Sequence, residues 1–220
     1  MATESNVRQD IIEACLEMNA IGLNQGTSGN VSVQYEDRML ISPSATQYAA
    51  MTPDMIAAID LSGGMPETWD GPLKPSSEWR FHWLALKNRE DVTAVVHAHP
   101  PYATALAILR KPIPACHYMI AAFGGMDVPV SGYATFGSRE LADHVMAALE
   151  GRSACLMANH GMVATGMGLE QAMWRASELE TIARQYHLAS LIGEPHILSE
   201  EQIDDTRRSL KGYGVQDAKV

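Results

Sequence analysis

The sequence predicts a single α/β (α+β) domain, residues 1–220, in which helices cover a central sheet. Three observations predict this class. The chain has 220 residues, which is enough to bury one substantial core. Short apolar runs typical of strands alternate along it with stretches whose apolar residues have helical spacing. The chain also contains neither an internal repeat nor a low-complexity segment, so a repeat architecture is excluded.

The first half of the chain begins with a helix and continues into strands. Apolar residues at helical spacing, closed by Gly22, predict the first helix, and alternating apolar and polar residues predict the first strands. Ser76 is the expected cap of a second helix, which places Glu78 in its first turn. The elements expected here are the helix 7–18, the glycine-rich loop 24–30, strands 31–35 and 39–41, the surface connection 61–71, the helix after Ser76, and the buried strand 92–97.

The second half of the chain contains mostly helices. Pro112 and Pro114 mark the exit from a first helix, and Ser138 is the expected cap of the next. The expected elements are helices 102–109 and 138–149, strand 154–158, the long amphipathic helix 169–192, and a polar surface tail over 208–220.

Composition narrows the possible partners and compartment. The formal net charge of -10 and the pI of about 5.2 argue against nucleic acid, whose phosphates require clustered Lys and Arg. Residues 1–10 do not have the pattern of a secretory signal, and no run is long enough to span a membrane, so we expect a cytoplasmic protein. Cys15, Cys116 and Cys155 lie in apolar surroundings and are expected to be reduced packing residues.

A pair of histidines at the end of a predicted strand indicates a metal site. His97 and His99 are two residues apart, so both side chains project from the same face of the strand. An H-x-H pattern alone is equally typical of ordinary core or surface histidines. His160 follows another apolar run and Glu78 begins a helix, and these additional ligands make a metal site the favoured interpretation. The remaining histidines are interpreted as solvated or packed: His82, His117, His144, His187 and His196.

The loop 26–30, Gly-Thr-Ser-Gly-Asn, is compatible with phosphate binding, because glycines let backbone N–H groups approach an anion. A plain tight turn explains the same composition. Phosphate binding is favoured only if Ser44, Ser76 and Ser77 converge on the loop. The loop is not a nucleotide P-loop, because the G-x-x-x-x-G-K-[ST] pattern is absent, and a small phosphorylated metabolite fits it better.

Residues 11–214 resemble the class II aldolase/adducin family, and within it the fuculose-phosphate aldolase branch. The motifs that carry the resemblance are at 22–32, 75–82, 96–99, 117–122, 133–137 and 160–161. The resemblance implies a mostly antiparallel central sheet and a Zn²⁺ ion held by His97, His99 and His160, with Glu78 as a ligand in the resting state. This is the same ligand set that the spacing of the residues indicates.

The resemblance also implies a reaction, namely reversible cleavage of a ketose 1-phosphate into dihydroxyacetone phosphate and a short aldehyde. Glu78, displaced from the metal by substrate, would be the base for the carbon-bound proton. Tyr118 matches the proton donor to the aldehyde oxygen and is contributed across a subunit boundary, so a homotetramer with interfacial sites is implied. The residues that match the phosphate site are Thr27, Gly29, Asn30, Ser44, Ala45, Ser76 and Ser77.

Departures from the family pattern concern the substrate. Ala45 stands where the fuculose-phosphate enzymes usually have glycine beside the phosphate. Phe123 makes the segment after Tyr118 bulkier and more apolar, and Phe136 and Tyr213 match residues that shape the aldehyde pocket. These residues are compatible with a 5-deoxyribulose or 5-methylthioribulose 1-phosphate as well as with fuculose 1-phosphate, and the sequence does not identify the physiological aldehyde.

Other functions remain open at this point. A pentulose-phosphate 4-epimerase and a methylthioribulose-1-phosphate dehydratase have the same fold, although the epimerases usually have Asp at the position of Glu78. A lysine Schiff-base aldolase is disfavoured because none of the lysines has an apolar setting. An adducin-like scaffold need not keep metal ligands, and no nucleophile motif supports a zinc hydrolase. Mn²⁺ or Co²⁺ are possible substitutes for Zn²⁺.

Overall fold

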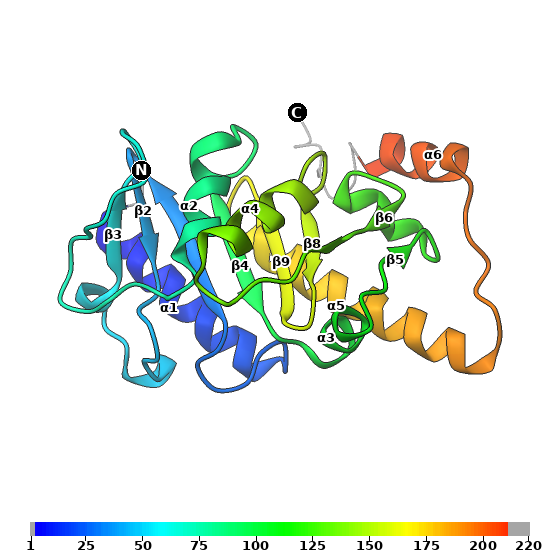
Figure 1. Ribbon diagram of the computed structural model, residues 1–220, viewed down its shortest axis with the longest axis horizontal. Helices are drawn as coiled ribbons and strands as arrows, with labels where there is room; N and C mark the ends of the chain where they lie inside the picture. The colour runs from blue at the N-terminus through cyan, green and yellow to red at the C-terminus, as the bar shows by residue number, and fades with distance from the viewer. Residues whose placement is uncertain (1–2, 211–220) are drawn as a thin grey trace, which may run out of the picture.

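The computed structural model describes residues 3–210, and its centre is a seven-stranded sheet with the order β3-β2-β1-β4-β9-β8-β7 (Figure 1). Neighbouring strands are antiparallel except β7 and β8, which are parallel. The expected class, a mostly antiparallel sheet in an α/β protein, is therefore confirmed. The strands are β1 (Asn30–Tyr35), β2 (Arg38–Ile41), β3 (Ala57–Asp60), β4 (Ala94–Ala98), β7 (Val130–Ser131), β8 (Ala154–Met157) and β9 (Gly161–Gly166). A two-stranded sheet pairs β5 (Ile113–Pro114) with β6 (Asp127–Val128).

Helices cover both faces of the sheet. α1, α3 and α5 contact one face, and α2 and α4 contact the other, while α6 packs on the short helix η3 at one end of the molecule (Figure 1). The helices are α1 (Glu4–Ala20), α2 (Trp79–Asn88), α3 (Pro101–Ile108), α4 (Arg139–Ala148), α5 (Leu169–Ile192) and α6 (Glu200–Leu210), with 3₁₀ turns η1 (Tyr48–Ala50), η2 (Pro53–Met55) and η3 (Tyr118–Phe123).

β4 is the central strand, and both of its faces are buried. Val96 faces the core shared with α1, α3 and α5, while Val95 faces the core shared with α2 and α4. Because both faces are covered, the strand is apolar throughout until His97, as a strand buried on both sides must be. His97 has no exposed surface and its ring meets the ring of Phe81 edge-on, with 5.6 Å between centroids, so its side chain lies on the α2 side.

Several expected elements differ from those observed. The long helix 169–192 and the helix capped by Ser138 are confirmed. Ser76 is not the helix cap. α2 begins at Trp79, with Glu78 as its N-cap residue. The Ser76 hydroxyl instead accepts a hydrogen bond from the Glu78 N–H at 3.3 Å. The strands β3 and β9 and the helix α6 were not predicted. α6 is strongly polar and buries only Ile203 among its described residues, so it lacks the run of apolar residues by which the other helices were predicted.

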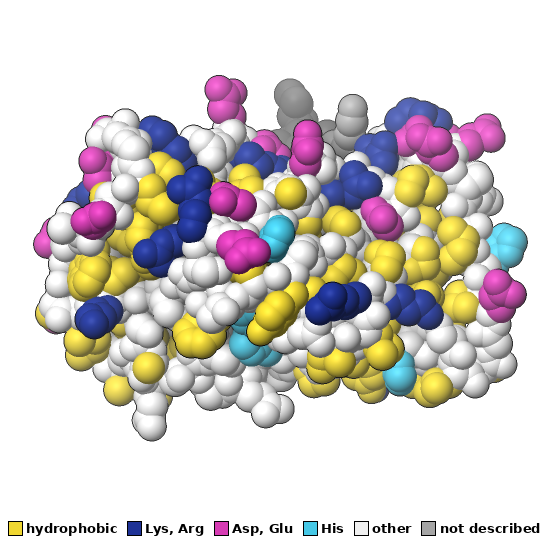
Figure 2. Space-filling model, in the orientation of Figure 1, with side chains coloured by type: hydrophobic (Ala, Val, Ile, Leu, Met, Phe, Trp, Pro, Cys, Tyr) yellow, Lys and Arg dark blue, Asp and Glu magenta, His cyan; other side chains and the backbone are white. Residues whose placement is uncertain are grey.

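The surface carries interspersed charges. Basic and acidic side chains alternate in small groups on the face shown in Figure 2. Within residues 3–210, no helix combines the length and the apolarity that a membrane crossing requires.

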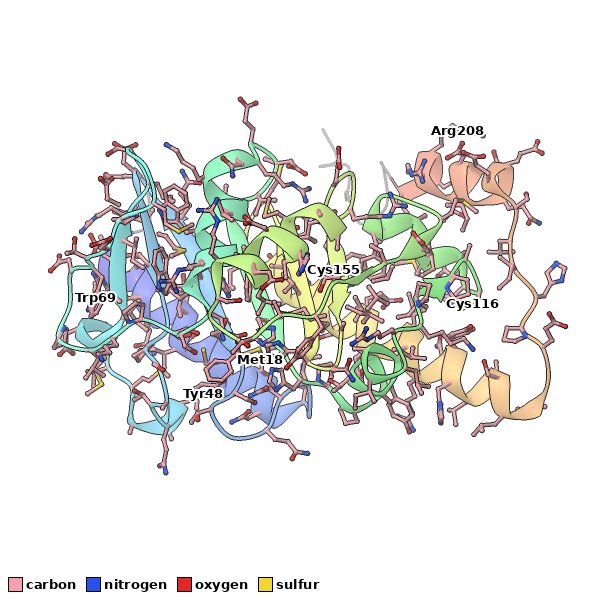
Figure 3. The ribbon with its side chains drawn as sticks, viewed as in Figure 1. Met18, Tyr48, Trp69, Cys116, Cys155 and Arg208 are labelled. Atoms are coloured by element: carbon pink, nitrogen blue, oxygen red, sulfur yellow. The ribbon has the colours of Figure 1, made fainter. Side chains whose placement is uncertain are left out.

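The cysteines are free thiols, as expected. Cys15 and Cys155 are buried and Cys116 is partly exposed, and Figure 3 shows Cys155 and Cys116 on separate segments of the chain. Burial raises the pKa of both the Cys15 and the Cys155 thiol to about 12, although a hydrogen bond with Ser42 slightly opposes the shift at Cys15. Both residues are therefore unreactive packing groups.

Candidate metal centre

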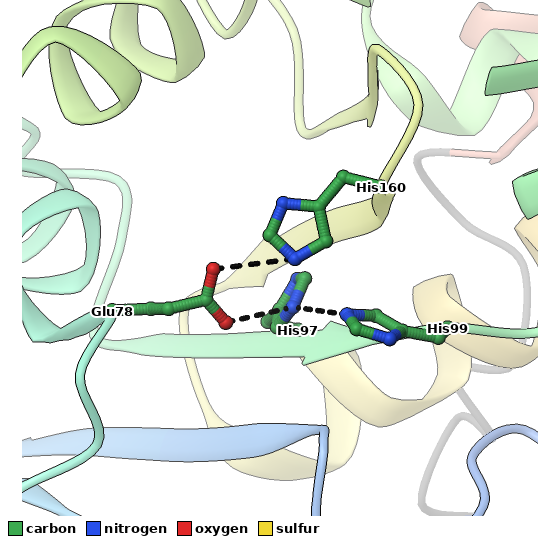
Figure 4. Close-up of side chains that lie close together, drawn as sticks. All are labelled: Glu78, His97, His99 and His160. Atoms are coloured by element: carbon green, nitrogen blue, oxygen red, sulfur yellow. Dashed lines mark hydrogen bonds and ion pairs between the residues drawn. The ribbon is translucent and has the colours of Figure 1, made fainter. Parts of the chain in front are cut away.

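Two of the four candidate ligands come from the end of β4. His97 is the fourth residue of the strand and His99 lies just beyond its last residue, so both rings project from the same edge of the sheet. His160 lies in the tight turn between β8 and β9, and β9 pairs with β4 on its other side. Glu78 comes from the other direction, at the start of α2. Three separate chain segments therefore meet at this point, as Figure 4 shows.

Glycines allow the backbone segments at the site to approach closely. A Cβ atom at Gly161 would lie 2.5 Å from the Ala98 carbonyl oxygen and 2.6 Å from the His99 ring. A Cβ atom at Gly29 would lie 2.8 Å from the carbonyl oxygen of His97. Because neither backbone oxygen can yield, any side chain at position 29 or 161 would displace the strand end that carries the histidines.

The ligand atoms of Glu78, His97, His99 and His160 all lie within 4.8 Å of one another. Glu78 Oε2 is 3.0 Å from His97 Nε2, and Glu78 Oε1 is 3.3 Å from His160 Nε2 (Figure 4). His97 Nε2 is also 2.9 Å from His99 Nε2. Glu78 and His97 are buried, while His99 and His160 are partly exposed and line a cavity.

The hydrogen bonds of the site direct ring nitrogens and carboxylate oxygens to one point. His97 Nδ1 is 2.9 Å from the carbonyl oxygen of Met162, which can only accept a hydrogen bond, so Nδ1 is the donor and Nε2 is the nitrogen that faces Glu78 and His99. The Oε1 atom of Glu78 is buried and has no hydrogen-bond donor among the described residues. A single proton could bind only one of the converging ring nitrogens and carboxylate oxygens, whereas a divalent cation can be bound by all of them. Three histidines and a carboxylate are also the donor set that Zn²⁺ prefers.

The protonation states at the site are set by burial and by the carboxylate. Burial alone would raise the pKa of Glu78, but the adjacent His97 and His160 and the hydrogen bond from Asn30 lower it to about 2. Burial, together with repulsion from His97, lowers the pKa of His99 to about 3 and that of His160 to about 4. At neutral pH Glu78 is therefore ionised and His99 and His160 are neutral, which are the protonation states that ligate a metal. Burial disfavours a charged His97, but the Glu78 carboxylate beside it raises the pKa of His97 above its ordinary value.

A cavity of about 550 Å³ opens directly above this cluster. Three chain segments form its polar wall, and all seven residues that the sequence assigned to phosphate are in its lining: Thr27, Gly29, Asn30, Ser44, Ala45, Ser76 and Ser77. Within the described part of the chain, no Lys or Arg lines this cavity. Its polar wall is thus made of neutral hydroxyl, amide and backbone groups.

The loop 24–30 is held rigid by two residues that the sequence did not single out. The Tyr48 hydroxyl donates to the carbonyl oxygen of Gly29 at 2.6 Å and accepts a hydrogen bond from the Asn24 side-chain amide at 3.3 Å. The Oδ1 atom of Asn24 accepts from the Ser28 hydroxyl and from the His99 backbone N–H. Asn24 and Tyr48 are buried, so the loop is fixed against β4 and not free to move.

The predicted aldehyde-pocket residues do not lie together. Phe136 lines the cavity and is 66% exposed, and Tyr133, which the sequence did not assign to the pocket, lies beside it in the lining. Phe123 is the last residue of η3, has no exposed surface and belongs to the core on the α5 side of the sheet, so it does not line the cavity. Tyr213 lies outside the described residues.

Tyr118 does not lie near the four candidate metal ligands of its own chain. It is 52% exposed on η3 and borders a different hollow, between η3, α5 and α6. If Tyr118 acts in catalysis, it must therefore reach the site of another chain.

Most of this chain matches one family. Residues 9–187 match the model of the class II aldolase and adducin N-terminal domain. This chain belongs to the class II aldolase and adducin family. The expected membership is thereby confirmed, and so is the expected enzyme class, a lyase of the aldolase type, which the names of the relatives share.

Relatives with similar sequences cover nearly the whole chain. A 5-methylthioribulose-1-phosphate/5-deoxyribulose-1-phosphate aldolase from Rhodospirillum rubrum is 48% identical over 208 residues, which are 94% of this chain and 92% of that protein. An L-fuculose phosphate aldolase from Escherichia coli K12 is 47% identical over 213 residues, 96% of this chain and 97% of that protein. A solved structure of L-fuculose 1-phosphate aldolase superposes with a TM-score of 0.89 at 39% identity, covering 96% of this chain and 98% of that one.

Proposed function

We propose that the protein is a metal-dependent class II aldolase that reversibly cleaves a ketose 1-phosphate to dihydroxyacetone phosphate and a short aldehyde. The observation that carries the proposal is the Glu78 carboxylate, held between His97 and His160 at the cavity. The residues fit a Zn²⁺ ion, or Mn²⁺ or Co²⁺ in its place, through His97, His99, His160 and Glu78. When bound, such an ion supplies Lewis acidity toward the ketone of the substrate.

The polar wall of the cavity is suited to the phosphate of the substrate. Thr27, Ser44, Ser76 and Ser77 offer hydroxyl donors, and Gly29 leaves the loop backbone accessible to an anion. Because these groups are neutral, they position the phosphate by hydrogen bonds, and a cation held by Glu78 and the three histidines would supply the balancing charge. This placement orients the carbon chain of the ketose toward Glu78.

Proton transfer is assigned to two residues. In the synthetic direction, Glu78 removes the proton from the hydroxymethyl carbon of dihydroxyacetone phosphate, and Tyr118 of a neighbouring subunit donates a proton to the aldehyde oxygen. In cleavage the same groups act in reverse: Tyr118 receives the hydroxyl proton, the carbon–carbon bond breaks, and Glu78 returns a proton to carbon. The exposed position of Tyr118, away from its own cavity, supports a homotetramer with interfacial sites.

The mouth of the cavity favours a substrate with an apolar end. Tyr133 and Phe136 are exposed aromatic side chains in its lining. Such rings suit the methyl end of 5-deoxyribulose 1-phosphate or the methylthio end of 5-methylthioribulose 1-phosphate. These two sugar phosphates appear in the names of several relatives. Fuculose 1-phosphate, whose aldehyde product is lactaldehyde, is the third candidate.

The test is an assay of purified protein, with and without a chelator, on these three sugar phosphates. Chelator-sensitive release of dihydroxyacetone phosphate supports the proposal, and the ratio of kcat/KM values ranks the substrates. Equal values for all three would contradict the apolar preference. Release of water without dihydroxyacetone phosphate would indicate a dehydratase, and interconversion of pentulose phosphates would indicate a 4-epimerase.

A further inference from the structure

Behind the metal centre, four polar side chains form a continuous buried chain. The Ser32 hydroxyl is 2.7 Å from His82 Nδ1, and His82 Nε2 is 2.6 Å from the side-chain oxygen of Asn30. The Asn30 amide nitrogen donates to Glu78 Oε2 at 3.2 Å. Ser32 and His82 have no exposed surface, and Asn30 and Glu78 are 4% and 5% exposed. Water therefore does not compete for these hydrogen bonds.

The Asn30–Glu78 contact sets the direction of the other hydrogen bonds among these four side chains. The Asn30 NH₂ group faces Glu78 Oε2, and the carboxylate that binds a metal can only accept. The Asn30 oxygen must then face His82, which has to donate from Nε2. Nδ1 of the neutral ring is left as an acceptor, and the Ser32 hydroxyl donates to it. With the Asn30 amide reversed, two acceptor oxygens would face each other across the buried Asn30–Glu78 contact.

The backbone explains why these residues meet. Asn30 and Ser32 are two apart on β1, so their side chains lie on the same face of the sheet. His82 is on α2, one turn after Glu78, and points to the same face. These hydrogen-bonded side chains therefore connect the N-terminus of α2, where Glu78 lies, to β1, the strand beside β4.

We propose that His82 is a positioning residue: through its Nε2–H it fixes the amide of Asn30, so that Asn30 holds Glu78 Oε2 toward the metal site. The inference rests on the proposed function, because it assigns a role toward the metal that Glu78 and the three histidines would bind. Without the His82 donor, the amide of Asn30 is free to rotate, and Glu78 loses the hydrogen bond that orients it. A residue that only filled the core would not require its ring nitrogens.

The first experiment reads the ring directly in the metal-free protein. Long-range ¹H–¹⁵N NMR correlations distinguish the two neutral histidine tautomers, and we expect His82 to have its proton on Nε2 and a bare Nδ1. A proton on Nδ1 would overturn the proposal, since the ring could not then donate to Asn30.

The second experiment measures Zn²⁺ affinity by competition with a chromophoric chelator. We expect His82→Leu to weaken Zn²⁺ binding about 10- to 100-fold, the usual effect of removing a hydrogen-bond partner behind a metal ligand. His82→Gln, whose amide nitrogen can take the place of Nε2, should restore most of the lost affinity. Leu86→Ala is the matched control: it removes a buried side chain of the same helix that lies outside the hydrogen-bonded chain, and Zn²⁺ affinity should not change.

A double-mutant cycle tests whether His82 acts through Asn30. In an Asn30→Ala background, His82→Leu should change Zn²⁺ affinity by less than about twofold. Full additivity, or an equal loss in His82→Leu and Leu86→Ala, would overturn the proposal. If His82→Leu does not fold, Ser32→Ala replaces it, because it removes the donor that fixes the tautomer. If the wild-type protein itself does not bind Zn²⁺, the proposed function fails first, and that result is distinct from the failure of the cycle.

Discussion

Asn30 and His97 are register partners across β1 and β4. Asn30 donates to one oxygen of Glu78, and His97 Nε2 lies 3.0 Å from the same oxygen. Adjacent strands thus hold a helix-borne carboxylate from two sides, and the sheet fixes the separation of the two groups. A site built on regular elements in this way is rigid before any ligand enters.

The substitution Glu78→Gln tests the proposed role of Glu78 as a base, because it keeps the size of the side chain and removes its carboxylate. We expect Glu78→Gln to lower kcat about 10²- to 10⁴-fold, because the amide cannot remove a proton from carbon. Glu140→Gln is the control: that side chain is exposed on α4, and the substitution should leave kcat unchanged. Turnover of Glu78→Gln close to that of wild type would rule out Glu78 as the base.

Metal removal should abolish activity reversibly. After dialysis against a chelator we expect no release of dihydroxyacetone phosphate, and added Zn²⁺, Co²⁺ or Mn²⁺ should restore it to different extents, because nitrogen and oxygen ligands accept all three ions. Borohydride added with substrate should not inactivate the enzyme. Activity that persists in chelator and is lost to borohydride would instead indicate a lysine Schiff base.

Short-range rules determine only part of the predicted ligand set. Residues that are two apart on a strand have side chains on the same face, so His97 and His99 were predicted to project together. Glu78 and His160 were predicted because each is a ligand-type residue at the end of an expected element, and the family motifs imply the same set. Their meeting with His97 depends on long-range strand pairing, which no local pattern encodes. The structure brings all four within 4.8 Å.

The residues that sequence reasoning missed act through tertiary contacts. His82 was interpreted as an ordinary packed histidine, since a lone histidine on a helix gives no signal of its partners. A hint existed, because Asn30 and Ser32 alternate on one strand and His82 follows Glu78 by one turn.

Phe123 was expected in the pocket because it is apolar and close in sequence to Tyr118, but its position at the end of η3 directs it into the core.

Mixing two inactive variants tests the predicted interfacial site. If Glu78 and Tyr118 of different subunits form one site, Glu78→Gln and Tyr118→Phe should each be nearly inactive alone. Oligomers assembled from both should recover about a quarter of wild-type activity, since that fraction of randomly mixed interfaces carries both native residues. The readout is kcat of co-refolded protein, and no recovery, or a fully active Tyr118→Phe, would contradict a Tyr118 shared between subunits.

Ala45 has a backbone conformation that suits glycine better. Its φ angle is +51°, in the left-handed region, where a Cβ atom is unfavourable by roughly 1 kcal/mol. We expect Ala45→Gly to raise the free energy of unfolding by about 0.5–1 kcal/mol, measured by urea denaturation. Ala105→Gly, at an exposed position within α3, should have the opposite sign and cost about 1 kcal/mol. Equal destabilisation by both substitutions would contradict strain at Ala45.

His82 should make the metal-free protein sensitive to acid. Burial, with a further contribution from His97, lowers the pKa of His82 to about 3 in the folded protein, whereas the unfolded chain titrates near 6.5. Above pH 6.5 neither state takes up a proton. Below it only the unfolded state does, so the free energy of unfolding falls as the pH drops from 6.5 toward 3.

His82→Gln removes this proton linkage and leaves the other buried histidines in place. Between pH 6.5 and 5, in chelator, we expect the free energy of unfolding of the wild type to fall by roughly 2 kcal/mol more than that of the variant, because one proton contributes about 1.4 kcal/mol per pH unit. His196→Gln is the control for replacing a histidine by glutamine, since that side chain is exposed. Parallel curves for wild type and His82→Gln would mean that the ring takes up a proton without unfolding, and would contradict a neutral His82 that is enclosed by Ser32 and Asn30.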